Sequence, residues 1–361
     1  MIKRFTHLWE RHERPISALG LIAGFFFDII VADRPDSIPN NLLLLSYIAL
    51  AGVLIIILNR REMRRLEAKH SVEPLFLLFA LQVFFGGLAS NLLVLYGRSG
   101  TFAGSALFLG ALAAMLVGNE FLKTRYAQLR LNIAVFYFLL LTYAVIAVPT
   151  FVTHTVGVGT FLLSGLASLA IAGFFLTLLH YFVFRREGAF SASAAQVVGS
   201  IYILFNLLYF LNVIPPVPLS LKESGVYHSL LRRADGNYLA LYEAPRWFEF
   251  WRATSGTYSL AGAGADGAFC YSSVFAPAEL KTPVYHRWEQ LDSSEGWVTR
   301  SLVSFPISGG RAEGYRGFSV KSNLGAGQWR CSVETAQGAL VGRVGFTVVE
   351  GGVRELSERT L

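Results

Sequence analysis

Seven long apolar runs between residues 16 and 213 constrain the fold of this chain more than any other feature. Each run contains about 17–26 residues, and a helix needs about 20 residues to cross the ~30 Å hydrocarbon core of a bilayer. Residues 1–215 are therefore predicted to form an all-α bundle of seven transmembrane helices. The predicted helices span residues 16–32, 41–59, 75–96, 102–122, 131–149, 159–184 and 194–213.

The connections between these runs alternate in charge. Four of them, including the N-terminal segment, carry 4, 5, 3 and 2 Lys or Arg residues, and the three others carry 1, 1 and 0. Basic residues accumulate on the cytoplasmic side of membrane proteins. The alternation predicts a cytoplasmic N-terminus, an uncleaved first helix rather than a signal peptide, and export of everything after Pro215.

Net charge gives no indication of nucleic-acid binding. The chain carries a net charge of +7, but residues 1–215 hold 16 basic and 10 acidic side chains, whereas residues 216–361 hold 15 and 14. The excess lies in the membrane half, where cytoplasmic loops face anionic lipid headgroups. The lipid bilayer is thus the partner that composition predicts, and no nucleic-acid partner is expected.

Few ionisable side chains fall inside the apolar runs, and such residues are expected to be functional by default. The candidate polar cluster consists of Asp28, Asn91, Asn206 and Asn212. Two interpretations remain open. The cluster lines an outward-facing pathway, or Asp28 accepts hydrogen bonds from the amides and locks the helices together.

Beyond Pro218 the sequence changes to short alternating segments separated by glycine-rich turns, which is typical of a sandwich or barrel. Residues 219–361 are predicted to form an all-β, immunoglobulin-like sandwich. The predicted strands span residues 237–243, 246–253, 268–275, 284–289, 297–305, 315–322, 328–335 and 340–349.

The two cysteines, Cys270 and Cys331, both lie in this exported region. An oxidising compartment permits a disulfide between them, and their spacing around Trp288 resembles that of an immunoglobulin core. Two buried, unpaired thiols on different strands are the alternative. The residues alone leave both possibilities open.

No catalytic motif is found, and neither a cofactor nor a metal is expected. Residues 262–267 match G-x-G-x-x-G, but a strand rather than a helix is predicted to follow, which argues against dinucleotide binding. Glu289 and Asp292 are expected on a solvated strand end. The chain is therefore not predicted to be an enzyme.

Aromatic and cationic residues of the exported region form a candidate binding surface. Aromatic rings stack on sugars, and Arg or Lys side chains bind carboxylate or phosphate groups. Packing in the core and simple solvation are the competing interpretations. The set comprises Tyr285, Arg287, Trp297, Tyr315, Arg316 and Lys321.

Four segments resemble a small bacterial domain family of unknown function that occurs in envelope proteins. They span residues 283–289, 314–321, 327–333 and 342–348, and a further likeness surrounds residues 242–247. The resemblance implies a bacterial inner membrane and a periplasmic C-terminal domain. It implies no activity and no functional residues.

Together these observations predict a non-enzymatic binding or scaffolding protein of the inner membrane. Its periplasmic sandwich is expected to recognise a protein or an envelope glycan. The alternative is a transporter or lipid-handling protein with a polar cavity near Asp28.

Overall fold

The computed structural model divides the chain into two compact units. The described residues are 25–30, 32, 34–68, 75–100, 102–121, 129–184, 188–260, 267–351 and 356–361. One unit holds the helices up to Ile214, and the other holds Pro215–Leu361 together with two short segments, Arg98–Gly104 and His154–Gly157.

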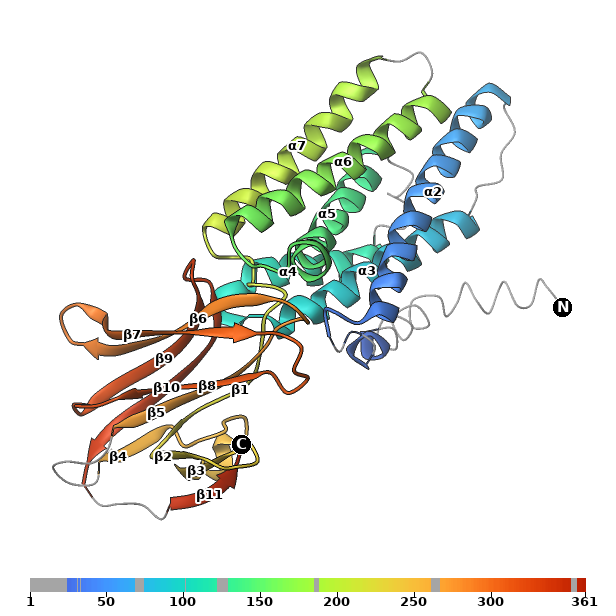
Figure 1. The fold of residues 1–361 in the computed structure, drawn as a ribbon. Coiled ribbons are helices and arrows are strands. Elements are labelled where there is room, and N and C mark those ends of the chain that lie inside the picture. The colour runs from blue at the N-terminus through green and yellow to red at the C-terminus, as the bar shows by residue number, and fades with distance from the viewer. Residues whose placement is uncertain are drawn as a thin grey trace. The chain divides into compact units, whose positions relative to one another are not determined.

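The described residues of the first unit form helices (Figure 1). Residues 25–30 are helical, whereas most of the predicted first helix, 16–32, lies outside the described residues. The other helices are α2 (Ile38–Ala68), α3 (Leu75–Arg98), α4 (Phe102–Phe121), α5 (Leu129–Val148), the π-helix η2 (Pro149–Thr153), α6 (Val158–Phe182) and α7 (Gly188–Phe210).

Five of the described helical segments are long and apolar enough to cross a membrane. They are Ile38–Arg61, Leu77–Arg98, Leu129–Thr153, Val158–Phe182 and Ser193–Phe210, and α4 contains a shorter apolar segment, Ser105–Gly118. The helix boundaries differ from the predicted ones mainly in α2. This helix continues through the basic segment after residue 59, because Arg, Glu and Met are good helix formers although they end the apolar run.

Glycines permit close helix contacts in this unit. A Cβ atom at Gly87 of α3 would lie 2.7 Å from Cε2 of Tyr47, and one at Gly165 of α6 would lie 2.7 Å from Cε2 of Tyr202. Small residues of this kind let helix backbones approach closely.

The second unit is all-β in its described residues after Ser220, apart from the short 3-10 helix η3 (Trp247–Glu249). Its strands are β1 (Ser220–Tyr227), β2 (Ser229–Arg232), β3 (Tyr238–Glu243), β4 (Thr257–Leu260), β5 (Ala268–Phe275), β6 (Lys281–Asp292), β7 (Gly296–Ser308), β8 (Tyr315–Lys321), β9 (Gly327–Thr335), β10 (Leu340–Glu350) and β11 (Leu356–Thr360). The predicted strand at 246–253 is wrong, because η3 and a turn occupy these residues.

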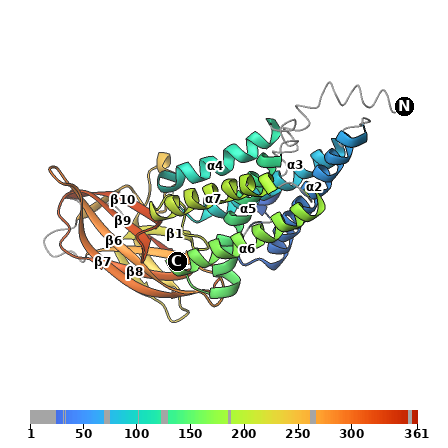
Figure 2. The same ribbon diagram turned by 90° about the horizontal axis from the view of Figure 1, so that it is seen from above.

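The strands form three sheets (Figure 1), and the neighbouring strands β10, β9, β6 and β7 can also be followed in Figure 2. The orders are β1-β5-β8, β4-β10-β9-β6-β7 and β11-β3-β2. All pairs are antiparallel except β4 with β10, which is parallel. The central β1-β5-β8 sheet is covered on both faces, since alternate residues of its strands enter different cores.

Two adjacent residues of β5 illustrate this arrangement. Cys270 belongs to the core that includes Trp288 and Trp329 of the five-stranded sheet, whereas Tyr271 packs with Leu230 and other residues of the β11-β3-β2 sheet. Successive side chains of a strand point to opposite faces. The unit is therefore built in three layers, with the β1-β5-β8 sheet in the middle.

Candidate functional site

The polar cluster of the helical unit contains Asp28, Asn40 and Asn91. Asn91 Nδ2 donates to Asn40 Oδ1 at 2.8 Å and to Asp28 Oδ1 at 3.5 Å, and Asn40 Nδ2 donates to Asn91 Oδ1 at 3.1 Å. All three residues are buried. The two amides pair with each other, and Asn91 reaches the carboxylate only at the limit of a hydrogen bond. Polar side chains paired in this way can hold helices together.

The other two residues of the predicted cluster lie elsewhere. Asn206 Nδ2 donates to the carbonyl of Tyr202 one turn earlier in α7, and Asn212 is exposed, with a positive φ of 55° just after the helix. The third member of the cluster is instead Asn40, which was not predicted from the sequence. It lies in the first turn of α2, outside the predicted helix 41–59.

An apolar groove of about 680 Å³ lies between α2, α5 and α6. Gly52, Phe136 and Phe175 contribute to its wall. Asn41 and Tyr143 also line it, but both are buried, and Tyr143 donates to Asn41 Oδ1 at 3.1 Å. Asp28 is not among the residues that line it. The groove is therefore suited to an apolar chain rather than to a polar solute.

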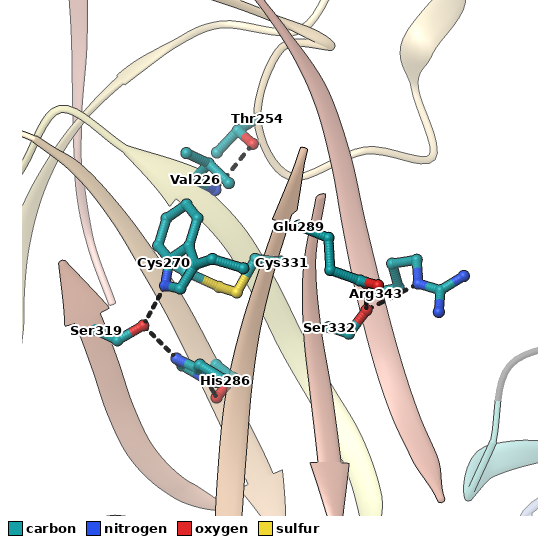
Figure 3. The surroundings of a disulfide bond; sticks show 11 residues. Val226, Thr254, Cys270, His286, Glu289, Ser319, Cys331, Ser332 and Arg343 are labelled. Atoms are coloured by element: carbon teal, nitrogen blue, oxygen red, sulfur yellow. Dashed lines mark hydrogen bonds between the residues drawn. A yellow bond between two sulfur atoms is a disulfide. The ribbon is translucent and has the colours of Figure 1, made fainter. Parts of the chain in front are cut away.

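In the β unit, Cys270 of β5 and Cys331 of β9, which are 61 positions apart in the sequence, form a disulfide. The bond connects the β1-β5-β8 sheet to the five-stranded sheet, and both residues are fully buried (Figure 3). The sulfurs lie within 4.8 Å of a ring nitrogen of His286. Since each sulfur is bonded to the other, neither is available as a thiolate ligand for a metal.

His286 is buried beside this disulfide. Its Nε2 is 2.8 Å from Ser272 Oγ and its Nδ1 is 2.9 Å from Ser319 Oγ. Burial lowers the pKa of His286 from 6.5 to about 4, because both of its hydrogen-bond partners are neutral hydroxyls and none offsets the lost hydration of the cation. A fully buried imidazole in a packed core cannot act on an external substrate.

The other face of the five-stranded sheet is polar. We call it the arginine face and define it by residues whose side chains point away from the disulfide core: Arg287 and Glu289 on β6, Trp297 and Thr299 on β7, Arg330, Ser332 and Glu334 on β9, and Arg343 on β10. Their positions follow from strand alternation, since each neighbours an inward residue such as Trp288 or Cys331. Register places Arg287, Ser332 and Arg343 in one row across three strands.

Arg330 is the most constrained cation of the arginine face. It donates to both carboxylate oxygens of Glu289, at 2.6 and 2.9 Å, and its guanidinium carbon lies 4.2 Å from the ring centroid of Trp297. Such bidentate pairs are strong and fixed in geometry. One face of the Trp297 ring is thus already in contact with a guanidinium.

Glu289 is correspondingly buried rather than solvated. It retains only 7% of its surface exposed and also accepts a 3.5 Å hydrogen bond from Ser332. The expectation of a solvated strand end is therefore wrong for Glu289. It fits Asp292 better, since this residue is partly exposed and accepts a hydrogen bond from the backbone N–H of Ser294 in the following turn.

Three arginines of this face share two carboxylates. Arg287 pairs with Glu334 at 2.8 Å and Arg330 pairs with Glu289, whereas the hydrogen bond of Arg343 goes to the hydroxyl of Ser332 at 2.9 Å. Partial burial, followed by the nearby charge of Arg330, lowers the pKa of Arg343. The guanidinium nonetheless stays charged. Glu289 and Glu334 are near enough to favour its charge, but among the described residues no carboxylate forms an ion pair with it, and its hydrogen bond to Ser332 is drawn in Figure 3.

The six residues of the predicted binding surface fall into two groups. Tyr285, Arg287 and Trp297 lie on β6 and β7 of the five-stranded sheet, and the other three lie on β8 of the central sheet. Tyr315 packs against a buried core, Arg316 donates to Asn237 Oδ1 at 2.8 Å, and Lys321 pairs with Ala268 in register. They do not form one surface.

Sequence reasoning missed most of the arginine face. Its β9 and β10 members, Arg330, Ser332, Glu334 and Arg343, were not among the candidates. The alternation of Arg330, Ser332 and Glu334 with Trp329, Cys331 and Val333 is a signal that the sequence does carry. This alternation identifies which side chains share a face of their strand. It does not identify the neighbouring strands that complete the face.

Comparisons with known proteins match one segment of the chain to a family and give no activity. Residues 281–348 match the family described as "Protein of unknown function (DUF2914)". The expected resemblance to an uncharacterised domain is confirmed for this segment, which contains every residue of the arginine face. No curated protein matches the chain.

One solved structure was found, that of Pseudomonas fluorescens alkylpurine DNA glycosylase AlkC bound to DNA containing an abasic site analog. It is 11% identical over 87% of this chain and 99% of that chain, with a TM-score of 0.19. A similarity this low carries no argument about fold or function.

Proposed function

We propose that this chain is an inner-membrane anchored, non-enzymatic binding protein whose β unit faces the periplasm and recognises an anionic envelope ligand through the arginine face. Five described helices of membrane-crossing length and the excess of basic residues in alternate connections support the anchoring and the orientation. A disulfide in the β unit fits an oxidising compartment.

We further propose that the β unit is an elaborated immunoglobulin-like sandwich. The strand orders β1-β5-β8 and β4-β10-β9-β6-β7 fit the two sheets of such a domain, with the disulfide between sheets and Trp288 packed against it. The unit departs from that pattern at Trp329, where a tyrosine is usual two residues before the second cysteine. The β11-β3-β2 sheet is the elaboration.

The unpaired cation of Arg343 is the observation that carries the binding proposal. A ligand carboxylate or phosphate would pair with it, and the neighbouring Arg330–Glu289 and Arg287–Glu334 pairs would hold the surrounding donors in place. Trp297 adds an apolar edge to the face rather than an open stacking platform, because Arg330 covers one side of its ring. A glycan or protein bearing acidic groups has this chemistry.

Titration of soluble carboxylate-bearing muropeptides and of a phosphorylated core oligosaccharide onto the full chain in lipid nanodiscs would test the proposal. Arg343→Gln should weaken binding of the preferred ligand by about tenfold or more, as expected for loss of a charged hydrogen bond. Arg232→Gln is a matched control, since Arg232 is an exposed arginine on β2 of another sheet. If neither glycan binds, cross-linking from position 343 in envelope extracts should capture a protein; absence of both would overturn the proposal.

Lipid handling is a second candidate, and the apolar groove between α2, α5 and α6 favours it over transport of a polar solute. The groove has the size of a small-molecule site. Its wall is almost wholly apolar, which suits contact with an acyl chain. A Phe174→Trp variant whose emission is unchanged by brominated lipid would count against lipid in this groove.

A further inference from the structure

The segment from Arg246 to Arg252, which we call the aromatic turn, carries four exposed aromatic side chains. The exposed fractions are 90% for Trp247, 44% for Phe248, 83% for Phe250 and 69% for Trp251. Adjacent rings touch edge to face, Trp247 with Phe248 and Phe250 with Trp251. Contiguous apolar surface of this kind on a folded domain marks an interaction site. At these exposures both indole rings offer open faces to a ligand.

The aromatic turn is held in place by two of its own side chains. Glu249 Oε2 accepts a hydrogen bond from the backbone N–H of Arg246 at 2.9 Å, and Glu249 Oε1 accepts one from Gly256 at 3.2 Å. Arg252 holds the other end of the turn by donating to the carbonyl of Gly345 on β10. Because the backbone is held at both ends, little of it has to be ordered when a ligand binds.

The aromatic turn adjoins the arginine face along β10. Gly345, whose carbonyl accepts from Arg252, lies opposite Arg330 in the register of β10 with β9. Arg343 lies two residues earlier on the same face of β10, about 7 Å away along the strand. Gly345 is exposed, and the nearest contact of a Cβ atom added there would be the carbonyl oxygen of Trp329, at 3.9 Å. The surface between the base of the turn and Arg343 is therefore accessible to a ligand.

We propose that the ligand of the arginine face is an acidic oligosaccharide whose sugar rings stack on Trp247 and Trp251 while one of its carboxylates or phosphates pairs with Arg343. The inference rests on the proposed function and names the class of its ligand. Sugar rings have apolar C–H faces that pack against the electron-rich faces of aromatic rings, and acidic substituents fit a guanidinium. The aromatic member of the arginine face, Trp297, is a poorer platform because Arg330 already covers one side of its ring.

The surroundings of the aromatic turn favour a glycan over a protein. A stable protein interface buries about 800 Å² on each partner and has an apolar centre. Beside the turn, however, the exposed surface continues with Gly345, Thr347 and Gln328, which add no apolar side chain. Arg246 and Arg252 flank the rings at the two ends of the turn. A small aromatic patch bordered by cations matches a molecule in which apolar ring faces alternate with hydroxyl and acidic groups.

Calorimetric titration of the full chain in lipid nanodiscs with two glycans of the same backbone tests the inference. One glycan is a peptide-free peptidoglycan strand, in which every second sugar carries a lactyl carboxylate, and the other is a neutral chito-oligosaccharide of equal length. The acidic strand should bind about tenfold or more tightly than the neutral one, as expected for a charged hydrogen bond. Arg343→Gln should lower the affinity for the acidic strand to that for the neutral glycan, and should leave the neutral glycan unaffected.

Substitution of the rings tests stacking separately from charge. Trp247→Ala with Trp251→Ala should weaken binding of both glycans by about tenfold, whereas Trp247→Phe with Trp251→Phe should retain most of the affinity because phenyl rings still stack. Leu231→Ala, at an exposed apolar site on β2 of another sheet, is the matched control and should leave binding unchanged. Since both indoles are mostly exposed, all of these variants should unfold at the same urea concentration as the wild type.

Failure of this inference can be told apart from failure of the proposed function. If Arg343→Gln weakens binding but the two alanine substitutions do not, the arginine face acts without the aromatic turn and the inference is wrong, while the proposed function stands. Equal losses in the alanine and phenylalanine variants would also overturn it, because stacking would not be the cause.

Two further outcomes concern the ligand itself. If neither the peptidoglycan strand nor the phosphorylated core oligosaccharide binds, but cross-linking from position 343 captures a protein, the inference fails and the proposed function remains. If no glycan binds and no protein is captured, both fail.

Discussion

His286 and Trp288, two positions apart on β6, meet at one hydroxyl. The indole Nε1–H of Trp288 donates to Ser319 Oγ at 2.9 Å, and Nδ1 of His286 lies 2.9 Å from the same oxygen (Figure 3). Ser319 is on β8 of the opposite sheet, so the hydroxyl joins the two layers beside the disulfide. The hydrogen bonding in this core therefore requires the imidazole of His286 to be neutral.

Acidification should destabilise the β unit through His286. Its pKa is about 4 when folded and 6.5 when unfolded, so the stability it contributes is present above pH 6.5 and is lost as pH falls toward 4. The loss amounts to about 3 kcal/mol at 1.36 kcal/mol per pKa unit. His228, whose pKa burial also lowers, acts in the same direction.

Urea unfolding followed by tryptophan emission would measure this effect, since five of the six tryptophans lie between residues 247 and 329. His286→Gln keeps hydrogen-bonding atoms but does not titrate. Its free energy of unfolding should vary less between pH 6.5 and 4 than that of the wild type. An equal slope in both proteins would show that His286 is not the group responsible.

Removal of the disulfide should cost about 4 kcal/mol, the loop-closure entropy expected for a bridge across about 60 residues. The double variant Cys270→Ala with Cys331→Ala should unfold at lower urea than the wild type by that amount. The wild type measured with reductant is the control for the cavity that alanine creates. Identical unfolding midpoints with and without reductant would contradict a bridge in the native protein.

The positions of most elements could be predicted because apolar residues follow one pattern in the helices and a different one in the strands. Apolar runs located the helices, and alternation located the strands around Cys270, Trp288 and Cys331. Strand β1 was missed because Lys222 and Glu223 interrupt its pattern where the register shifts. Residues 246–253 were predicted as a strand because their composition is strand-like, but Glu249 caps the backbone N–H of Arg246 and the segment forms the short helix η3 and a turn.

The site was harder to predict because it depends on which strands are neighbours. Arg330 follows Trp329 in sequence, but its partner Glu289 is 41 residues away on β6. The same limit applies to Asn40 and Asn91, which are 51 residues apart. The periodicity of the sequence assigns a residue to one face of its strand or helix. Which residues pair across that face depends on how neighbouring elements are aligned, and this alignment is seen only in the folded chain.

Arg330→Met should destabilise the β unit by about 3 kcal/mol, because it leaves the buried carboxylate of Glu289 without its cation. Adding Glu289→Met should restore most of that loss. Arg343→Met is the matched control on the same face, and since Arg343 has no carboxylate partner its cost should stay below about 1 kcal/mol. Additive costs in the double variant, measured by urea unfolding, would refute coupling between Arg330 and Glu289.

Substitutions at Asp28 and Asn91 should distinguish a helix lock from a substrate pathway. Asp28→Asn preserves an acceptor for Asn91 Nδ2 and should leave the aggregation temperature of the detergent-solubilised protein nearly unchanged. Asn91→Leu removes the partner of both Asn40 and Asp28 and should cost about 1–2 kcal/mol, seen as a lower aggregation temperature. The reverse order of effects would contradict the lock. Loss of a cellular phenotype in Asp28→Asn at normal abundance and normal aggregation temperature would instead mean that the carboxylate is needed for its charge, as a pathway requires.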